Sequence, residues 1–271
     1  MAVLLRASLV ALLGLLVPLA GPPRHAQAFE VERRIPATTE AFLGQAAGAP
    51  LLGLLTLPVG RSGPLPVVIF VPDVDGSGGR TALYGERLLE NGWAIVELFP
   101  GLEHRAQVPQ PLAAALRTIA ADARLEAGRP LLVGLGAGAR TALAAWAAGA
   151  PIGRLALLYP GCDAALAAEA RGATPSLPTS QMLLLHGGAD PANTPDRCAD
   201  LVAALPAGTG ALHRILPGAS YAWDAAFMVR PGGMAKLPHP GDPALRVVAR
   251  PDLTTALIAA DRLLAFALGG E

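Results

Sequence analysis

The hydrophobic positions of this chain form short apolar runs that alternate with stretches of helical spacing. The run from Leu65 to Val71 is rich in β-branched residues and ends at Pro72-Asp73, a pattern typical of a strand buried on both faces. Further runs of this kind are Trp93–Phe99, Pro130–Leu135, Leu155–Tyr159, Met182–His186 and Leu212–Leu216. Helical spacing occurs over Thr81–Glu90, Pro111–Glu126, Arg140–Ala148, Thr194–Leu205 and Leu253–Leu268.

This alternation predicts β-α-β units in a single α/β domain spanning residues 29–271. We expect a mostly parallel sheet of about seven or eight strands with helices on both faces. Two earlier segments, Glu30–Ile35 and Leu51–Leu57, are expected to form an antiparallel pair at one edge. The segment Met228–Arg250 is rich in glycine and proline, which predicts a long surface loop.

The N-terminal residues have the parts of a secretory signal peptide. Arg6 precedes an apolar run, Leu9–Ala20, and a short polar stretch ends in Ala26-Gln27-Ala28. The alternative is an uncleaved membrane anchor, but the run is short for a spanning helix and Pro18 interrupts it. We therefore expect residues 1–28 to be removed near Ala28 and the protein to be periplasmic or secreted. Membrane contact is expected only through an uncleaved signal segment.

Composition narrows the classes of partner. Hydrophobic residues make up 52% of the chain and charged residues 15%, which is typical of a globular protein with a sizeable core. Cleavage near Ala28 removes two arginines and no acid, so the formal net charge falls from 0 to −2. This balance disfavours nucleic acid as a partner. The two cysteines have no metal-binding spacing, so we expect no metal site, and no cofactor is expected.

Four turns that follow predicted strands carry the candidate chemistry. They lie within Phe70–Gly79, Gly134–Gly138, Leu183–Asp190 and Leu216–Asp224. Their order and spacing resemble the dienelactone hydrolase family of the α/β-hydrolase superfamily, over roughly residues 50–268. The resemblance implies the α/β-hydrolase fold, with reacting groups at the carboxyl ends of the strands.

The turn Gly134-Leu135-Gly136-Ala137-Gly138 matches the nucleophile elbow of that family, in which small residues flank a central nucleophile. Gly134 and Gly138 meet the demand for small flanking residues. The central residue is Gly136, which tolerates the strained backbone of the elbow but has no side chain that could attack a carbonyl. The resemblance therefore predicts that the turn forms but carries no nucleophile.

The other triad positions of the resemblance are Asp190 and Tyr221. Asp190 matches the triad acid. The alternative is an ordinary turn or helix-cap aspartate before Pro191. Tyr221 occupies the position of the histidine, and a phenol is an inefficient general base near pH 7. For the oxyanion hole the resemblance points to the loop at Asp73 and to the N–H of Ala137. An inward-pointing Asp73 carboxylate is expected to repel a developing oxyanion.

These losses predict a non-catalytic pseudo-hydrolase that keeps a pocket beside Gly136, Asp190 and Tyr221 for a small molecule or a protein partner. One alternative is an active carboxylic-ester or lactone hydrolase that uses a non-standard nucleophile. Another is a structural or interaction protein whose former pocket is filled by side chains.

Several remaining residues have a simpler interpretation. Within the implied fold, Cys162 and Cys198 follow neighbouring strands, so an exported protein could join them in a disulfide, and a free catalytic cysteine is the weaker alternative. We interpret Ser77 and Ser220 as turn residues. The four histidines outside the predicted signal peptide are interpreted as surface or structural groups; they are His104, His186, His213 and His239.

A dinucleotide-binding fingerprint, G-x-G-x-x-A, also fits Gly134, Gly136 and Ala139, with Asp163 further along the chain. That fingerprint belongs to the first β-α unit of its domain, whereas several predicted strands precede it here. We therefore attribute the match to a composition rich in glycine and alanine.

Overall fold

The computed structural model describes residues 36–44, 51–76, 79–99, 109–177, 181–225, 229–230 and 232–270. All of them belong to one compact unit, Arg33–Glu271. The predicted signal peptide and its cleavage point at Ala28 lie outside the described residues. Among the described helices, none has both the length and the apolar character that a membrane span requires.

Eight of the described strands form one sheet, in the order β1-β2-β4-β3-β5-β6-β7-β8. The strands from β4 to β8 along this order run parallel, whereas β2 is antiparallel to both β1 and β4. This arrangement confirms the mostly parallel sheet that the sequence predicts. The strands are β1 Ala37–Leu43, β2 Leu51–Pro58, β3 Val67–Val71, β4 Ala94–Leu98, β5 Leu131–Leu135, β6 Arg154–Leu158, β7 Gln181–Gly187 and β8 Gly210–Leu216.

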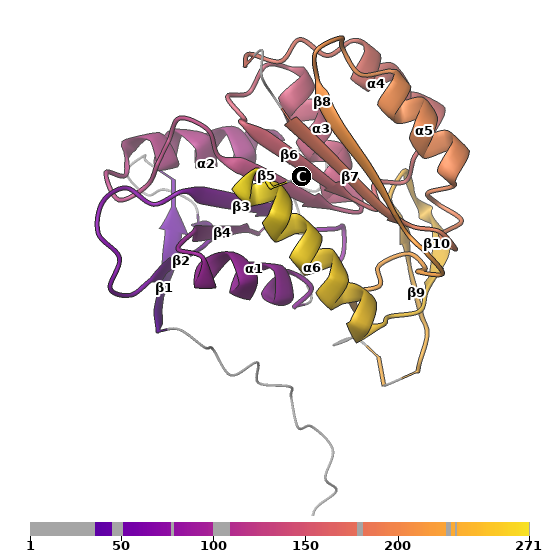
Figure 1. The fold of residues 1–271 in the computed structure, drawn as a ribbon, viewed down its shortest axis with the longest axis horizontal. Coiled ribbons are helices and arrows are strands. Elements are labelled where there is room, and N and C mark those ends of the chain that lie inside the picture. Colours follow the sequence, from indigo (N-terminus) through magenta and orange to yellow (C-terminus); the bar gives the residue numbers. More distant parts are fainter. Residues whose placement is uncertain are drawn as a thin grey trace, which may run out of the picture. The chain divides into compact units, whose positions relative to one another are not determined.

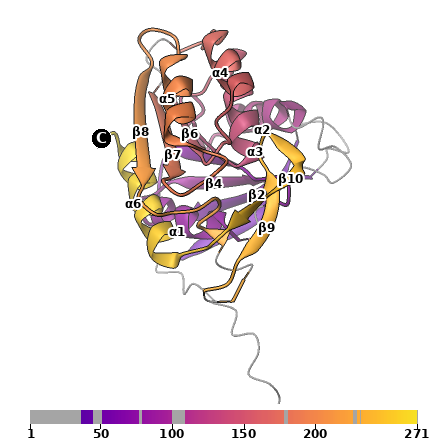
Figure 2. The same cartoon turned by 90° about the vertical axis from the view of Figure 1, so that its right-hand side faces the viewer.

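Helices cover both faces of the sheet (Figure 1; Figure 2). One face packs against α1 and α6, and the other packs against α2, α3, α4 and α5. The helices are α1 Thr81–Glu90, α2 Pro109–Ala121, α3 Ala137–Ala147, α4 Ala164–Arg171, α5 Pro195–Ala203 and α6 Leu253–Leu268.

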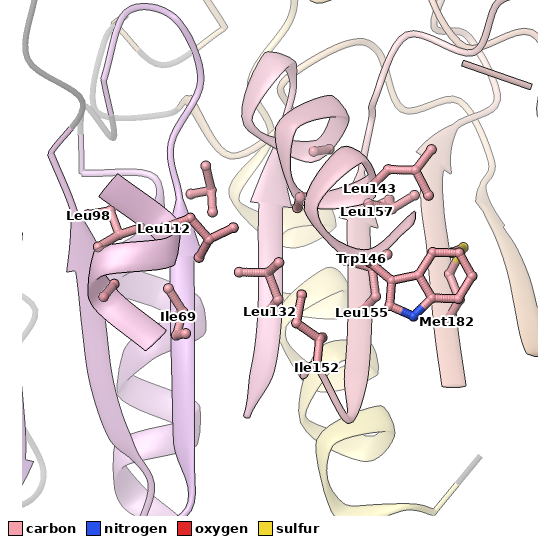
Figure 3. Packing of buried hydrophobic residues seen from close by; sticks show 14 of the residues in the cluster. Ile69, Leu98, Leu112, Leu132, Leu143, Trp146, Ile152, Leu155, Leu157 and Met182 are labelled. Atoms are coloured by element: carbon pink, nitrogen blue, oxygen red, sulfur yellow. The ribbon is translucent and has the colours of Figure 1, made fainter. Parts of the chain in front are cut away.

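Alternating side chains of the central strands supply two hydrophobic cores. In β3, Val67, Ile69 and Val71 face the core under α2 to α5, whereas Val68 and Phe70 face the core under α1 and α6. Figure 3 shows part of the first core, in which Trp146 of α3 packs among residues of β5 to β7. Burial on both faces explains why these strands read as continuous apolar runs. The two covered faces leave the strand ends as places for chemistry.

Three sequence predictions need correction. The edge partner of β2 is β1, Ala37–Leu43, while the expected partner Glu30–Ile35 lies outside the described residues. The expected loop Met228–Arg250 contains an antiparallel hairpin, β9 Ala235–His239 and β10 Asp242–Ala249. Pro238 in β9 and Pro243 in β10 conceal the strand pattern. Proline is tolerated in a two-stranded ribbon because each strand has an outer edge. Helix α4 was not predicted.

Candidate functional site

The sharp bend after β5 is centred on Gly136. Its φ of 54° and ψ of −119° lie in a region that glycine adopts readily and other residues adopt with strain. Its N–H donates to the carbonyl of Leu158 at the end of β6, 3.0 Å away. The chain then enters α3 directly at Ala137. Residue 136 is therefore raised at the carboxyl edge of the sheet, as the sequence predicts.

The flanking glycines are required by close packing. A Cβ added at Gly134 would overlap the backbone of Ala139, and one added at Gly138 would overlap the backbone of Val71 and Pro72. The loop after β3 therefore lies directly against the bend. This contact determines where the next residue of that loop, Asp73, can place its side chain.

The carboxylate of Asp73 fills the space over Gly136. A Cβ added at residue 136 would overlap the carboxylate atoms of Asp73, which is only 1% exposed. Its Oδ1 accepts two backbone hydrogen bonds, from the N–H of Val74 at 2.8 Å and from that of Ala137 at 3.0 Å. Any side chain at residue 136 would compete with Asp73 for the same volume.

Two further groups hold the other oxygen of Asp73. Oδ2 accepts from the hydroxyl of Tyr221 at 2.6 Å and from Nη1 of Arg80 at 3.0 Å. Arg80 is fully buried and its Nη2 reaches both carboxylate oxygens of Asp75. Burial and the neighbouring Asp73 raise the pKa of Tyr221 far above its ordinary value, so its hydroxyl remains protonated and donates.

We compared the chain with protein families, curated proteins and solved structures. No protein-family model matches the chain, and no curated protein matches its sequence. Solved structures do match. A dienelactone hydrolase-like promiscuous phosphotriesterase from metagenomic libraries shares 17% identity with a TM-score of 0.62, covering 86% of this chain and 98% of that one.

A dienelactone hydrolase from Anabaena variabilis has 18% identity and a TM-score of 0.59, and covers 86% of this chain and 98% of its own. The esterase domain of a Rhodothermus marinus protein has 16% identity and a TM-score of 0.59 over the same shares, 86% and 98%. The chain has the α/β-hydrolase fold. At these identities the similarity establishes the fold, and the chemistry has to be argued from the residues.

In an α/β-hydrolase fold, the oxyanion hole consists of the N–H after the nucleophile and an N–H from the loop after β3. At the corresponding places in this chain lie the N–H of Ala137 and the N–H of Val74, and both donate to Oδ1 of Asp73. The Asp73 carboxylate therefore points inward and engages both of these donors.

A second buried network lies behind the first and was missed by the sequence analysis. The carboxylate of Asp224 accepts from the hydroxyls of Tyr84 and Tyr159, at 2.7 and 2.8 Å, and the indole N–H of Trp223 donates to Tyr84 at 3.1 Å. Burial raises the pKa of Asp224, against the opposing effects of Arg80 and the two tyrosines. The available signal was the run Tyr221-Ala222-Trp223-Asp224, in which an acid follows three residues of apolar character.

Asp190, which the resemblance matches to the triad acid, bonds to other groups in the structure. Its carboxylate accepts from the N–H of Ala192 and from Nδ2 of Asn193, each at 2.8 Å. Oδ1 of Asn193 in turn accepts from the N–H groups of Gly161 and Cys162. Asp190 therefore links the loops after β6 and β7, and the hydroxyl of Tyr221 bonds to Asp73 instead.

Burial raises the pKa of Asp190 from 3.8 to about 6, although hydrogen bonds from Ala192 and Asn193 oppose the shift. The folded state then holds a proton more tightly than the unfolded state. The proton is therefore released on unfolding in this pH range.

We expect the contribution of Asp190 to the free energy of unfolding to fall as pH rises from 3.8 to about 6 and to level off above that. The expected fall in the free energy of unfolding is about 2–3 kcal/mol. Urea unfolding of the wild type and Asp190→Asn between pH 4 and 7 would measure it, since the amide cannot titrate; parallel pH profiles would contradict the assignment.

The disulfide expected between Cys162 and Cys198 is present. The S–S distance is 2.01 Å, both residues are buried, and the described residues contain no free cysteine. It connects the loop after β6 to α5, next to Asn193. A catalytic cysteine is therefore not available at either position while the bond is intact.

Removing this disulfide is expected to lower the free energy of unfolding by about 2–4 kcal/mol, because the bond closes a loop between residues 36 positions apart. The double variant Cys162→Ala/Cys198→Ala tests this by urea unfolding, since it leaves no lone thiol. Reduced wild-type protein serves as the control and should approach the same midpoint. Equal midpoints for oxidised wild type and variant would rule out this contribution.

The remaining nucleophile and base candidates have structural roles. The hydroxyl of Ser220 accepts from the N–H of Arg250 at 2.7 Å, and its single proton has the carbonyls of Tyr221 and Arg250 within reach, each at 3.2 Å. These bonds connect its loop to the end of β10. His186 and His213 bond to each other through their Nε2 atoms at 2.8 Å. The Nδ1 atom of His239 accepts two backbone N–H groups at the hairpin turn. Ser77 and His104 lie outside the described residues.

Asp163 acts as a helix cap. Its carboxylate accepts from the N–H of Leu166 at the start of α4 and forms an ion pair with Arg140 at 3.0 Å. The glycine-rich turn that precedes it follows β5, and four described strands come before β5 along the chain. Both facts favour the elbow interpretation over the dinucleotide fingerprint.

The prediction of a pocket beside Gly136, Asp190 and Tyr221 needs correction, because the space over Gly136 is not open. The Asp73 carboxylate occupies the space over Gly136, and Tyr221 and Asp190 are 0% and 3% exposed. In the part of the chain that the structure describes, no group of three or more histidine, cysteine or acidic residues is arranged to hold a metal ion.

Proposed function

We propose that this chain is a non-hydrolytic protein with the fold of the dienelactone hydrolases, whose former catalytic centre is sealed by Asp73. One observation carries the proposal. The same carboxylate accepts both oxyanion-hole N–H groups and fills the volume that a nucleophile at residue 136 would need. A substrate carbonyl cannot reach these N–H groups while Asp73 holds them.

The absence of usable partners among the described residues supports the same conclusion. The position matched to the base holds Tyr221, whose hydroxyl donates a hydrogen bond to Asp73. The position matched to the acid holds Asp190, which bonds within its own loop. In triads studied by mutation, loss of the nucleophile alone removes nearly all the catalysis that the triad supplies. Here the substitutions affect the nucleophile, the base and the oxyanion hole together.

The proposed role is binding, to a small molecule or a protein, at a surface other than the sealed centre. Because Asp73 fills the space over Gly136, we favour a former pocket that is filled by side chains over a pocket that is retained. We also propose export, on the basis of Arg6, the apolar run that follows it and the A-x-A end at Ala28. Mass spectrometry of protein from the producing cells should find Phe29 as the first residue; an intact N-terminus would contradict export by this route.

The rival function is hydrolysis of esters or lactones through a non-standard nucleophile. Purified protein is expected to give no turnover of nitrophenyl acetate or of a simple lactone above the rate of buffer. It is also expected to resist labelling by a fluorophosphonate probe. Turnover that disappears in Ser220→Ala or in the Cys162→Ala/Cys198→Ala variant would establish the rival and identify its nucleophile.

A further inference from the structure

A hollow of about 250 Å³ opens at the end of the sheet opposite Gly136. Arg129, Gly153, Arg154 and Gln181 line it. Arg129 comes shortly before β5, Arg154 begins β6 and Gln181 begins β7. Arg154 pairs in register with Leu131 on one side and with Gln181 on the other. The hollow is therefore formed by the amino ends of three adjacent parallel strands.

Arg154 is held in a fixed orientation by neutral acceptors. Its Nε donates to Oε1 of Gln181 at 3.0 Å, and its Nη1 donates to the carbonyl of Ala267 at the end of α6, at 2.6 Å. Nη2 lies beside Gly269, where an added Cβ would be 3.0 Å away. These two bonds fix the orientation of the guanidinium without neutralising its charge, and neither of them uses Nη2.

Gly153 allows the second arginine to lie next to the first. A Cβ added at Gly153 would lie 2.6 Å from the Cβ of Arg129, and the N–H of Gly153 donates to the carbonyl of Pro130 at 3.1 Å. Arg129 is exposed. In the described part of the chain, neither Arg129 nor Arg154 forms an ion pair with an acidic side chain. Two arginines thus line one hollow, and neither is paired with a described carboxylate.

We propose that this hollow binds a small compound through a carboxylate or phosphoryl group. Guanidinium groups present planar pairs of N–H donors that match such oxoanions, and an anion between two cations relieves their mutual repulsion. The amide of Gln181 adds a neutral polar group to the lining. The site lies at the opposite strand ends from Gly136, so this inference holds whether or not the sealed centre is inactive.

The test is isothermal titration calorimetry of the purified protein with inorganic phosphate and, separately, with benzoate, at constant ionic strength set by chloride. Saturable binding of at least one anion is expected. Arg129→Gln should weaken it at least fivefold, and Arg154→Lys should weaken it similarly, because lysine keeps the charge but loses the planar pair of donors. Arg171→Gln, an exposed arginine at the end of α4, is the matched control and should bind as the wild type does.

The two probes distinguish the sources of the anion. Saturation with phosphate alone assigns the site to phosphoryl compounds, and saturation with benzoate alone assigns it to carboxylates. No saturable binding of either anion overturns the proposal. Binding that persists unchanged in Arg129→Gln and Arg154→Lys also overturns it. Circular dichroism of each variant confirms that it is folded before the affinities are compared.

Discussion

Replacing Asp73 with alanine is expected to lower the free energy of unfolding by about 3–5 kcal/mol, the range found when one partner of a buried ion pair is removed. The variant removes one acidic hydrogen-bond partner of fully buried Arg80, whose bonds to Asp75 remain. It also leaves the N–H groups of Val74 and Ala137 and the hydroxyl of Tyr221 without their acceptor. Each buried donor without a partner adds a desolvation penalty.

Urea unfolding measures this effect, and Asp75→Ala is the matched control. Asp75 pairs with the same arginine, but its side chain is 23% exposed, so its removal should cost less than half as much. Formate or acetate should partly restore the stability of Asp73→Ala, because a small carboxylate can occupy the vacated position and accept the same donors. Equal losses in the two variants, without rescue by formate, would refute the assigned role of Asp73.

Gly136→Ser is expected to destabilise the protein and to restore no esterase activity. A side chain at φ of 54° is strained, and its Cβ overlaps the Asp73 carboxylate. Backbone strain and overpacking together should lower the free energy of unfolding by about 2–5 kcal/mol. The serine would also have no base, because Tyr221 retains its proton, and no free oxyanion hole.

A double-mutant cycle with Asp73→Gly tests the overlap itself. If the two residues compete for one volume, the loss in Gly136→Ser/Asp73→Gly will be smaller than the sum of the single losses, by about 1–3 kcal/mol. Urea unfolding of the four proteins gives the coupling, and nitrophenyl acetate turnover is measured on each. Additive losses would contradict the overlap. Measurable hydrolysis by the single variant Gly136→Ser would contradict the sealed centre.

The central sheet was predictable because its strands are buried on both faces. Leu65–Val71 and Pro130–Leu135 must be apolar throughout, and such runs stand out against the helical spacing between them. The hairpin β9–β10 was not predictable in this way. Only a few of its side chains, such as Leu237 and Val247, enter the core, while Pro238 and Pro243 are typical of loops.

The position of the elbow was predictable, and the role of Asp73 was only half predictable. Glycines at 134 and 138 reflect backbone contacts that any residue with a Cβ would break, so the sequence reports them directly. The direction of the Asp73 side chain depends on Arg80 and on Tyr221, which is 148 positions away. No periodicity in the sequence encodes such a contact. The sequence did contain one sign of this contact, which is the acid Asp73 after β3 together with a glycine, Gly136, at the elbow.

The network over Gly136 also bears on how the chain folds. Asp73 bonds to residues 64 and 148 positions away, and Tyr84 bonds to Asp224 across 140 positions. Contacts between such distant segments close large loops, whose entropy must be lost before the hydrogen bonds form. A buried charge that lacks its partners is costly, so we expect Arg80 and its acidic partners to lose their hydration only when all of these segments have come together.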